Sequence, residues 1–331
     1  MSQSSQHPQQ ASSPRGEGAG DAPPVRVVFF GMSGVLSARP LAALLTDTRI
    51  DVRAAALPAL APHGTQVPPV RTLPPVALPA RSLRLLTPVE PGLRQLAAAH
   101  GIPALEIADV AHPETLAALA AFAPDVIAVS CFPRRLPPAL LRLPRLGALN
   151  VHPSLLPDNR GPDPLFWTFW RGDAETGVSI HLMDEGLDTG SLLAQERVAI
   201  PEGVSEAWLE RALAEIGGRL LAESVLALAR GTARPVPQGE RQATRFGFPL
   251  AEDYEIRPEW PARRAYVFAA GVIGRGVPVI IALPDARVQV IEPLSYEPES
   301  TLGEPWRREG DVLRLQCAPG VFVARVEVHP R

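Results

Sequence analysis

The chain has 331 residues, of which 46% are hydrophobic and 20% charged, so it is long enough for two ordinary domains with cores of their own. Its formal net charge of −3 provides no global basic field for nucleic acid, and all 32 basic residues are arginine, which argues against a lysine Schiff base or a P-loop lysine. Two widely spaced cysteines match no metal-ligand spacing, and with no membrane span and no secretory signal they indicate a reduced, cytoplasmic setting.

The chain opens with a polar tail and then alternates strand and helix. Residues 1–24 are rich in Ser, Gln, Pro and Gly and offer too little apolar surface to fold, which predicts a disordered tail. Val25–Phe30 is predicted as a buried strand and the segment after Gly31–Gly34 as a helix through Leu45. The two glycines do not complete G-x-G-x-x-G, so a tight strand-to-helix turn is favoured over a dinucleotide site.

A proline-rich connection separates this opening from a central strand. A short strand is predicted at 50–56, and the connection 58–91 could hold another at Arg84–Leu86. Helices are predicted at 92–100 and 113–121. Asp125–Cys131 has the nearly continuous apolar character of a central parallel strand.

The next segments extend the alternation of strands and helices. An aromatic-rich helix is predicted at 165–170 and a strand at 192–200. A helix to about Arg230 is predicted from apolar residues that recur every four positions and should face the core; these are Val204, Trp208, Ala212, Ile216 and Leu220. The alternation implies a doubly wound, mostly parallel α/β sheet for residues 25–231.

A second, smaller domain is predicted beyond a polar linker. Residues 232–244 form the linker and 245–331 the second domain, with one helix at 262–270. Short alternating runs after this helix predict a small β-barrel; they lie at 277–282, 288–291, 312–316 and 321–328.

Asn150 and His152 stand at the end of one strand. Ala148–His152 is predicted as a strand that stops at Pro153, because proline cannot donate to the ladder. Side chains alternate along a strand, so Asn150 and His152 point the same way. This places His152 at the carboxyl edge of the sheet, where ligands bind in open α/β folds.

A second stretch brings a carboxylate toward the same edge. Residues 177–183 alternate as a strand and run into a loop closed by Gly186 and Gly190, within which Asp188 could face a neighbouring strand end. An amide, an imidazole and a carboxylate that meet in this way suit acyl transfer. The amide polarises a carbonyl, the imidazole moves a proton, and the carboxylate orients and charges the imidazole.

Together, Asn150-x-His152-Pro-Ser-Leu-Leu-Pro157 and Asp184-Glu-Gly-Leu-Asp188-Thr-Gly190 closely resemble the formyltransferases that use 10-formyltetrahydrofolate. The resemblance is strong from about Val25 to Gly231 and weaker beyond. It implies a Rossmann-like catalytic domain, a formyl donor of the folate class and an amine acceptor. The placement of the second domain resembles the OB-like domain of the tRNA-directed branch.

The resemblance also assigns roles to residues. It implies that Asn150, His152 and Asp188 are the catalytic trio. Folate contacts are implied for residues of both motifs and of the turn after the central strand; these are Leu136, Ser154, Leu155, Leu156, Pro157 and Asp184.

Plainer interpretations compete at several positions. The turn between Pro153 and Pro157 could be structural only, and Asp184 could simply shape its loop. His181 is expected to be a structural hydrogen-bonding group rather than a proton carrier. Arg160 could grip an anionic part of a substrate or lie in a solvated turn. No short-spaced pair of ligands supports zinc, so no metal is expected.

Three acceptor hypotheses remain. Initiator methionyl-tRNA is favoured by the two-domain length, and a small amine such as an amino sugar nucleotide is the first alternative. The third is a formyltetrahydrofolate hydrolase or a non-catalytic binding protein on the same scaffold. Against tRNA, residues 234–331 carry thirteen arginines and thirteen acidic residues, and 58–83 offers only Arg71 and Arg81 where the tRNA-directed enzymes have a basic loop.

Overall fold

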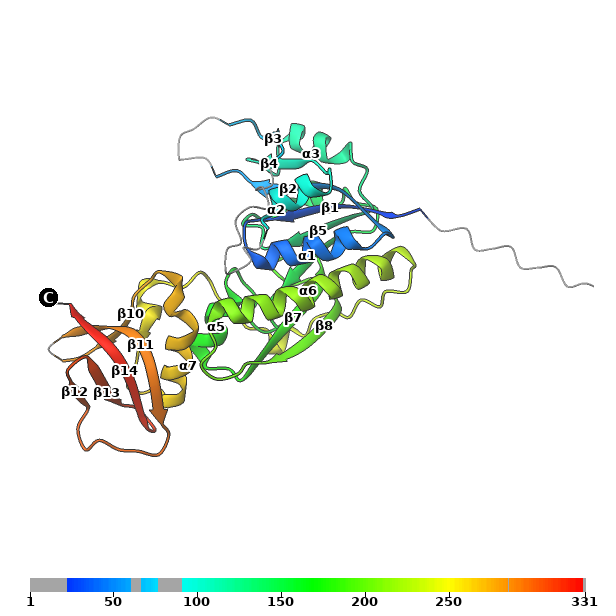
Figure 1. Ribbon diagram of the computed structural model, residues 1–331. Coiled ribbons are helices and arrows are strands. Elements are labelled where there is room, and N and C mark those ends of the chain that lie inside the picture. Colours follow the sequence, from blue (N-terminus) through cyan, green and yellow to red (C-terminus); the bar gives the residue numbers. More distant parts are fainter. Residues whose placement is uncertain (1–22, 61–66, 77–90, 285, 330–331) are drawn as a thin grey trace, which may run out of the picture.

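Two β-sheets organise the protein in the computed structural model (Figure 1). The structure describes residues 23–60, 67–76, 91–284 and 286–329. Apart from two residues, the predicted tail 1–24 lies outside these ranges, and so does the possible strand at Arg84–Leu86.

The first sheet has eight strands in the order β3-β4-β2-β1-β5-β6-β7-β8. Five strands, from β4 across to β6, pair in parallel, whereas β3, β7 and β8 add antiparallel pairs at the two sides. The bounds of its strands are β1 Val25–Gly31, β2 Ile50–Pro58, β3 Val70–Leu73, β4 Ala104–Ile107, β5 Val126–Ser130, β6 Ala148–His152, β7 Glu175–Leu182 and β8 Leu192–Ala199. This arrangement confirms the predicted mostly parallel α/β sheet.

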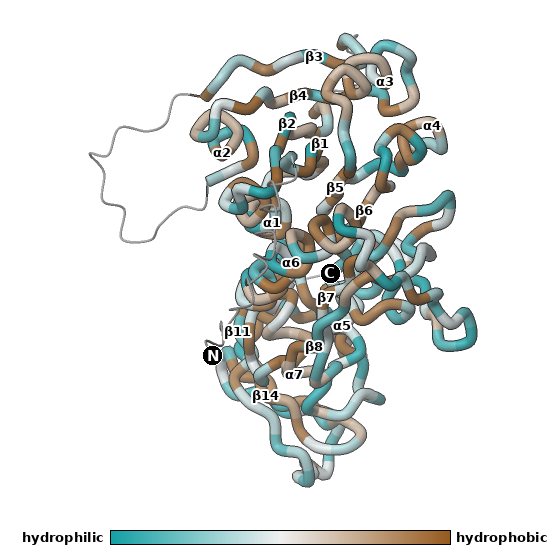
Figure 2. The backbone as a smooth tube through the Cα atoms, turned by 90° about the vertical axis from the view of Figure 1, so that its right-hand side faces the viewer, coloured by the Kyte–Doolittle hydropathy of each residue, from teal (hydrophilic) through white to brown (hydrophobic). Residues whose placement is uncertain are grey.

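Helices cover both faces of this sheet, as expected for a doubly wound fold. The apolar cluster on one face includes residues of α1, α2 and α6, and the cluster on the other includes residues of α3 and α4. Every residue of β5 is buried, and the middle strands stand out as hydrophobic in Figure 2. The bounds are α1 Val35–Thr46, α2 Leu93–Ala99, α3 Pro113–Ala120, α4 Pro138–Leu141, α5 Pro164–Arg171 and α6 Glu206–Ala229.

The predicted C-terminal β-structure is a second sheet of six strands, in the order β12-β13-β14-β11-β10-β9. Its strands are β9 Glu255–Ile256, β10 Val279–Ala282, β11 Arg287–Glu297, β12 Trp306–Glu309, β13 Val312–Gln316 and β14 Val321–His329. Helix α7 (Ala262–Val272) packs on this sheet and also against α5 of the first half. Short 3-10 turns lie at Glu240–Gln242, Ala251–Tyr254 and Ile273–Arg275.

Aromatic rings and two arginines join the two halves. The guanidinium of Arg264 on α7 lies over the rings of Trp170 and Trp260, with its carbon 4.4 and 3.9 Å from their centroids. Arg275 forms ion pairs with Asp163, which caps α5, and with Glu206, which opens α6. Cation–π contacts and partly buried ion pairs of this kind hold the second half in one place.

The predicted core stripe of α6 is confirmed at Leu220, which is buried in the core, and is wrong at Trp208. Trp208 is exposed, and Ala212 and Ile216 are only half-buried. The buried residues of this part of the helix are Leu209, Leu213, Ala214, Gly217, Gly218, Leu220 and Leu221. A Cβ at Gly217 would come 2.8 Å from Val151 Cγ1, and one at Gly218 would come 3.0 Å from Ala43 Cβ. The helix turns its glycines inward because they allow close approach to β6 and α1, a preference that hydrophobic periodicity does not register.

The connection 58–91 also differs from expectation in its described part. Residues 70–73 form the edge strand β3 there, which pairs antiparallel with β4. None of the helices in the described ranges combines the length and apolar character needed to cross a membrane.

Candidate active site

The candidate site forms where β6 ends. Strand β6 runs parallel to β5 and antiparallel to β7, with Asn150 opposite His181 and His152 opposite Ser179. Pro153 follows His152 directly, so the ladder stops with the His152 side chain at the carboxyl edge. This placement agrees with the position predicted from the sequence.

The His152 ring is buried and hydrogen-bonded on one side. Its Nε2 lies 2.9 Å from the carbonyl oxygen of Asn159. A carbonyl only accepts, so Nε2 carries the proton of the neutral ring and Nδ1 has the free lone pair. Burial lowers the pKa of His152, although the charge of Asp188 and the Asn159 carbonyl act in the opposite direction. His152 is therefore a neutral base near pH 7.

Asp188 lies next to this free nitrogen. Its Oδ2 accepts a hydrogen bond from the Gly161 backbone N–H at 2.9 Å, and its Oδ1 is 3.8 Å from His152 Nδ1. Burial opposes ionisation, but the imidazoles of His152 and His181 and the Gly161 N–H outweigh it and hold the pKa of Asp188 at about 2. The backbone of Asp188 lies in the left-handed region, with φ 56°. This conformation is costly for a residue other than glycine.

His181 belongs to the same cluster. Its Nδ1 lies 2.8 Å from the Leu182 carbonyl and so carries a proton, which leaves Nε2 to accept from the Asn150 amide at 3.2 Å. The prediction that His181 has a structural hydrogen-bonding role agrees with these contacts. Its effect is to fix which end of the Asn150 amide is NH₂ and to aim that NH₂ toward Asp188.

Three nitrogens surround one carboxylate oxygen. Asp188 Oδ1 is 3.5 Å from Asn150 Nδ2, 3.7 Å from His181 Nε2 and 3.8 Å from His152 Nδ1. All three separations exceed ordinary hydrogen-bond lengths. Asn150, His152 and Asp188 are thus brought together as predicted, with polar atoms turned toward a common point.

The turn after His152 is built from internal hydrogen bonds. The Ser154 hydroxyl donates to the Asp158 carbonyl at 2.7 Å, and the Ser179 hydroxyl donates to the Ser154 carbonyl at 2.7 Å. Ser154 and Leu156 are buried, with exposures of 1% and 2%, and the Leu156–Pro157 peptide is cis. Leu155 packs beneath Gly177, where an added Cβ would lie 2.4 Å from Leu155 Cδ2. The side chains of Ser154 and Leu156 shape the turn, and the predicted folate contacts of this segment stay a prediction.

The other predicted folate residues lie on either side of the trio. Leu136 is buried in the apolar cluster beside β5, and Asp184 is exposed and accepts from Gly186 N and Thr189 Oγ1 within its own loop. Phe132 stands edge-on to Phe30, with centroids 5.1 Å apart. Burial raises the pKa of the Cys131 thiol to about 12, so this cysteine is not a nucleophile.

Both interpretations of Arg160 from the sequence are wrong. Its side chain is 0% exposed, so it is not in a solvated turn. Its guanidinium is already bound within the protein, to Gln238 Oε1 through Nε at 3.1 Å and Nη2 at 2.8 Å, and to Glu240 Oε1 through Nη1 at 2.9 Å. Arg160 therefore contacts the segment that leads to the second sheet and not a substrate anion.

Four residues of that segment, Gln238, Glu240, Thr244 and Phe246, contact the turn after β6 or the Asp188 loop, although the sequence predicts only a linker at 232–244. Arg160 N donates to the Thr244 carbonyl and Phe246 N donates to the Arg160 carbonyl, both at 3.0 Å. Asn159 N donates to Thr244 Oγ1 at 2.8 Å. Gln238 reaches the Asp188 loop itself. A polar segment of this kind carries no hydrophobic period, so its sequence gives no signal for its position.

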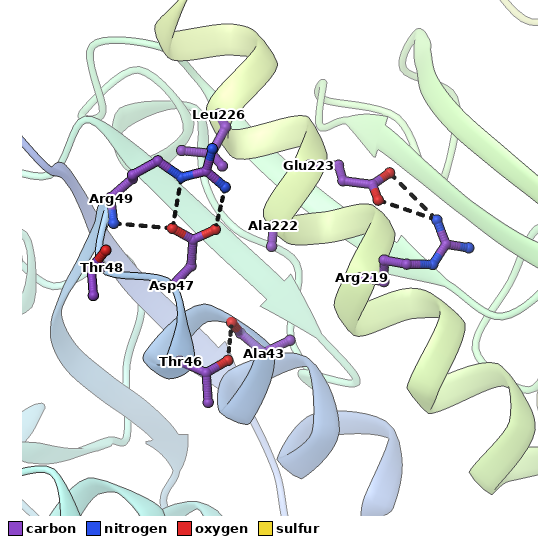
Figure 3. Close-up of a pocket in the computed structure, with 9 residues that line it drawn as sticks. All are labelled: Ala43, Thr46, Asp47, Thr48, Arg49, Arg219, Ala222, Glu223 and Leu226. Atoms are coloured by element: carbon purple, nitrogen blue, oxygen red, sulfur yellow. Dashed lines mark hydrogen bonds and ion pairs between the residues drawn. The ribbon is translucent and has the colours of Figure 1, made fainter. Parts of the chain in front are cut away.

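A surface pocket of about 540 Å³ lies elsewhere, between α1 and α6 (Figure 3). It adjoins Asp47–Arg49, which precede β2 and thus mark the amino edge of the parallel strands. Its arginines are already paired, Arg49 with Asp47 and Arg219 with Glu223. The pocket therefore lies away from the trio, and its charged side chains are engaged with one another.

Metal binding has no support at the trio. Within the part of the chain that the structure describes, no group of three or more His, Cys, Asp or Glu side chains could hold a metal ion. The expectation that the protein works without a metal stays a prediction.

Comparisons with known proteins identify relatives. A family model described as formyl transferase matches residues 89–225. A methionyl-tRNA formyltransferase from Synechococcus sp. (strain JA-3-3Ab) is 36% identical over 241 residues, which are 72% of this chain and 73% of that protein. One from Anaeromyxobacter dehalogenans (strain 2CP-C) is 37% identical over 251 residues, 73% of this chain and 79% of that protein.

A solved structure supports the fold. The N-formyltransferase from Helicobacter canadensis, in complex with folinic acid and dTDP-3-aminofucose, matches with a TM-score of 0.60 at 12% identity. The match covers 92% of this chain and 100% of that protein. The likeness therefore extends over both sheets.

Proposed function

Because the chain belongs to the formyl transferase family, we propose that this formyl-transferring enzyme moves the formyl group of 10-formyltetrahydrofolate to the amine of methionyl-tRNA. The observation that carries the acceptor is the 36% identity with a methionyl-tRNA formyltransferase over 72% of the chain. We assign the chemistry to residues 25–231 and contact with the acceptor to the segment 236–244 and the second domain, 245–331.

The donor supplies an activated formyl carbon, and in this proposal the Asn150 amide acts on its oxygen. One N–H of Asn150 Nδ2 donates to His181 Nε2 at 3.2 Å, and the other has only a 3.5 Å contact with Asp188 Oδ1. This second N–H is therefore free to donate to an oxygen that gains negative charge as the amine attacks. A donor aimed at such an oxygen typically contributes about 2.7–4 kcal/mol.

His152 is the general base of the proposal. Its Nδ1 lone pair faces the point that Asp188 Oδ1 and Asn150 Nδ2 share, so it takes the proton that the attacking amine loses. The lowered pKa of His152 keeps the ring neutral before the reaction. Asp188, ionised with a pKa of about 2, then stabilises the imidazolium that forms. As the tetrahedral intermediate collapses, the bond between the formyl carbon and the folate nitrogen breaks, and the imidazolium returns its proton to that leaving nitrogen.

We further propose that the pterin lies along the carboxyl ends of β5 and β6. Segment 131–136 and the loop of Asp184 flank this edge, and the turn Ser154–Pro157 supplies its floor through backbone groups. In this proposal Leu136, Leu155, Leu156 and Pro157 act through shape, whereas Ser154 and Asp184 hold the two loops.

The free cysteines, Cys131 and Cys317, support a reduced, cytoplasmic setting.

A small amine such as an amino sugar nucleotide is the second candidate, and charge favours it. Phosphate-backbone binding calls for a basic face, yet most arginines of the second half are paired with carboxylates, as Arg287 is with Glu255 and Arg325 with Glu292. Within residues 236–284 and 286–329, the exposed arginines that form no ion pair with a carboxylate are few; they are Arg241, Arg257 and Arg308.

A transfer assay decides between these acceptors. The full chain is incubated with 10-formyltetrahydrofolate and either methionyl-tRNA or a panel of amino sugar nucleotides. We expect formyl-methionyl-tRNA, with a KM for tRNA that rises steeply with salt. Transfer only to the sugar nucleotides would replace the proposed acceptor. Loss of formyl groups without any amine would indicate a hydrolase, and no turnover with any acceptor would indicate a binding protein.

A further inference from the structure

Gln238 stands outside both sequence motifs, but its side chain reaches the loop that carries Asp188. Its Nε2 donates to the Asp188 carbonyl at 2.9 Å and to the Gly190 carbonyl at 2.7 Å. Its Oε1 accepts from Nε and Nη2 of Arg160. Carbonyls only accept and a guanidinium only donates, so the orientation of the amide is fixed and all four of its hydrogen bonds are made.

These bonds close a ring through three segments. Arg160 belongs to the turn after β6, and the next residue, Gly161, donates its N–H to Asp188 Oδ2 at 2.9 Å. The Asp188 carbonyl is held by Gln238, and Gln238 is held in turn by Arg160. Asp188 is therefore bound at both ends, by its carboxylate and by its carbonyl, and both connections lead back to the same turn.

The ring is needed because Asp188 has an unfavourable backbone. A non-glycine residue in the left-handed region persists only where its surroundings hold it, and φ at Asp188 is 56°. The carboxylate must also stay 3.8 Å from His152 Nδ1. A displacement of about 1 Å at such a group can cost about a hundredfold in rate.

We propose that Gln238 is a positioning residue for the formyl transfer, which sets the place of the Asp188 carboxylate through its two bonds to the Asp188 loop. The inference rests on the proposed function, and it adds to that function a residue of segment 236–246. Gln238 touches neither substrate; it acts through Asp188. Arg160, the other hydrogen-bond partner of Gln238, holds the Gln238 side chain in place.

Two substitutions separate this role from a plain structural one. Gln238→Met removes the amide but keeps the length and the neutral charge. Gln238→Glu keeps an acceptor for Arg160 but replaces the two donors to the Asp188 loop by a charged carboxylate oxygen, which the Asp188 and Gly190 carbonyls repel. If Gln238 merely satisfied the buried Arg160, Gln238→Glu would behave as the wild type.

The matched control is Gln242→Met. Gln242 is exposed and lies in the same segment as Gln238, so this variant makes the same chemical change a few residues away. It should leave the Asp188 loop as it is, because the bonds to that loop come from Gln238.

The first readout is the split between kcat and KM for formyl transfer. Both Gln238→Met and Gln238→Glu are expected to lower kcat about tenfold to a hundredfold, with KM for 10-formyltetrahydrofolate within about twofold of the wild type. Gln242→Met is expected to match the wild type. Should Gln238→Met fail to fold, Gln238→Glu alone gives the answer. Wild-type kcat in Gln238→Glu, or a loss confined to KM or to melting temperature, would overturn the proposal.

The second readout needs no turnover. The His152 ring is titrated by NMR and assigned through the signal that disappears in His152→Gln. Because the Asp188 charge raises the pKa of His152, its displacement in Gln238→Met should lower that pKa relative to the wild type and to Gln242→Met. An unchanged His152 titration with an unchanged kcat refutes the positioning role. If the wild type transfers no formyl group, the proposed function fails, and the titration alone then judges the role of Gln238.

Discussion

Two segments wall the candidate site, and their positions are determined in different ways. The turn from Pro153 to Gly161 continues a buried strand and is held by its own hydrogen bonds, such as Ser154 Oγ to the Asp158 carbonyl. Segment 236–246 has little regular structure and is placed by its bonds to that turn, through Gln238, Thr244 and Phe246. The motif therefore supplies the proposed reacting side chains, whereas a segment without a motif holds the loop and the turn that carry them.

Removal of the Asn150 amide tests the side chains that the motif supplies and should have the largest effect. Asn150→Ala is expected to lower kcat about a hundredfold to a thousandfold, or about 2.7–4 kcal/mol, because the oxyanion loses its donor. Steady-state kinetics with methionyl-tRNA measure the effect, with melting temperature as the check on folding. A variant that kept a third of the wild-type kcat would remove Asn150 from the proposed mechanism.

Gly161→Ala attacks the contact between the two segments. Gly161 has φ +131°, and an added Cβ would lie 2.0 Å from the Phe246 carbonyl oxygen, so segment 236–246 must move away. We expect a loss of about 2 kcal/mol or more in the free energy of unfolding, measured by urea denaturation. The matched control is Gly247→Ala, because a Cβ there meets nothing within 4 Å. Equal stability of the two variants would contradict the close approach.

The pH dependence of kcat/KM tests the charge interaction between Asp188 and His152. Burial lowers the pKa of His152 and the Asp188 charge opposes this shift, so Asp188→Asn should lower the pKa further. The acidic limb of kcat/KM, where His152 gains its proton, is expected to move to lower pH while the maximum rate falls. An acidic limb that stayed in place or moved to higher pH would show that His152 is not the titrating base.

The smallest effect should come from the outer side of segment 236–246. Arg241 is exposed and forms no ion pair with a carboxylate among the residues that the structure describes. Arg241→Ala is expected to raise KM for tRNA about threefold and to lower the salt dependence by about one phosphate contact, with folate KM unchanged. Arg308→Ala, on β12 at the far end of the second sheet (Figure 1), is the control. Equal effects in both variants would argue against a specific contact at Arg241.

The trio is predictable because each member lies next to a strand whose end is marked in the sequence. Pro153 ends β6 directly after His152, and Gly186 and Gly190 bracket the loop of Asp188. The fold follows from the alternation of apolar strands and helices for the same reason. Local signals of this kind act over a few residues and need no knowledge of distant partners.

The rest depends on long-range contacts. From the sequence, Arg160 is available to a substrate because its partners, Gln238 and Glu240, are 78 and 80 positions away in the chain. The predicted inward face of α6 is shifted around the helix, although Leu220 is correctly placed, because Gly217 and Gly218 have no side chain that hydrophobic periodicity could detect. In each case the deciding contact joins segments that the sequence gives no reason to connect.

The backbone bonds between Arg160 and residues 244 and 246 also bear on how the protein could be cut or recombined. A fragment that stopped at Gly231 would retain the whole first sheet but lack Gln238, whose side chain holds the Asp188 and Gly190 carbonyls. Exchange of C-terminal halves between homologues would need a crossover before Val236. Such engineering must therefore keep residues 236–246 together with the first sheet.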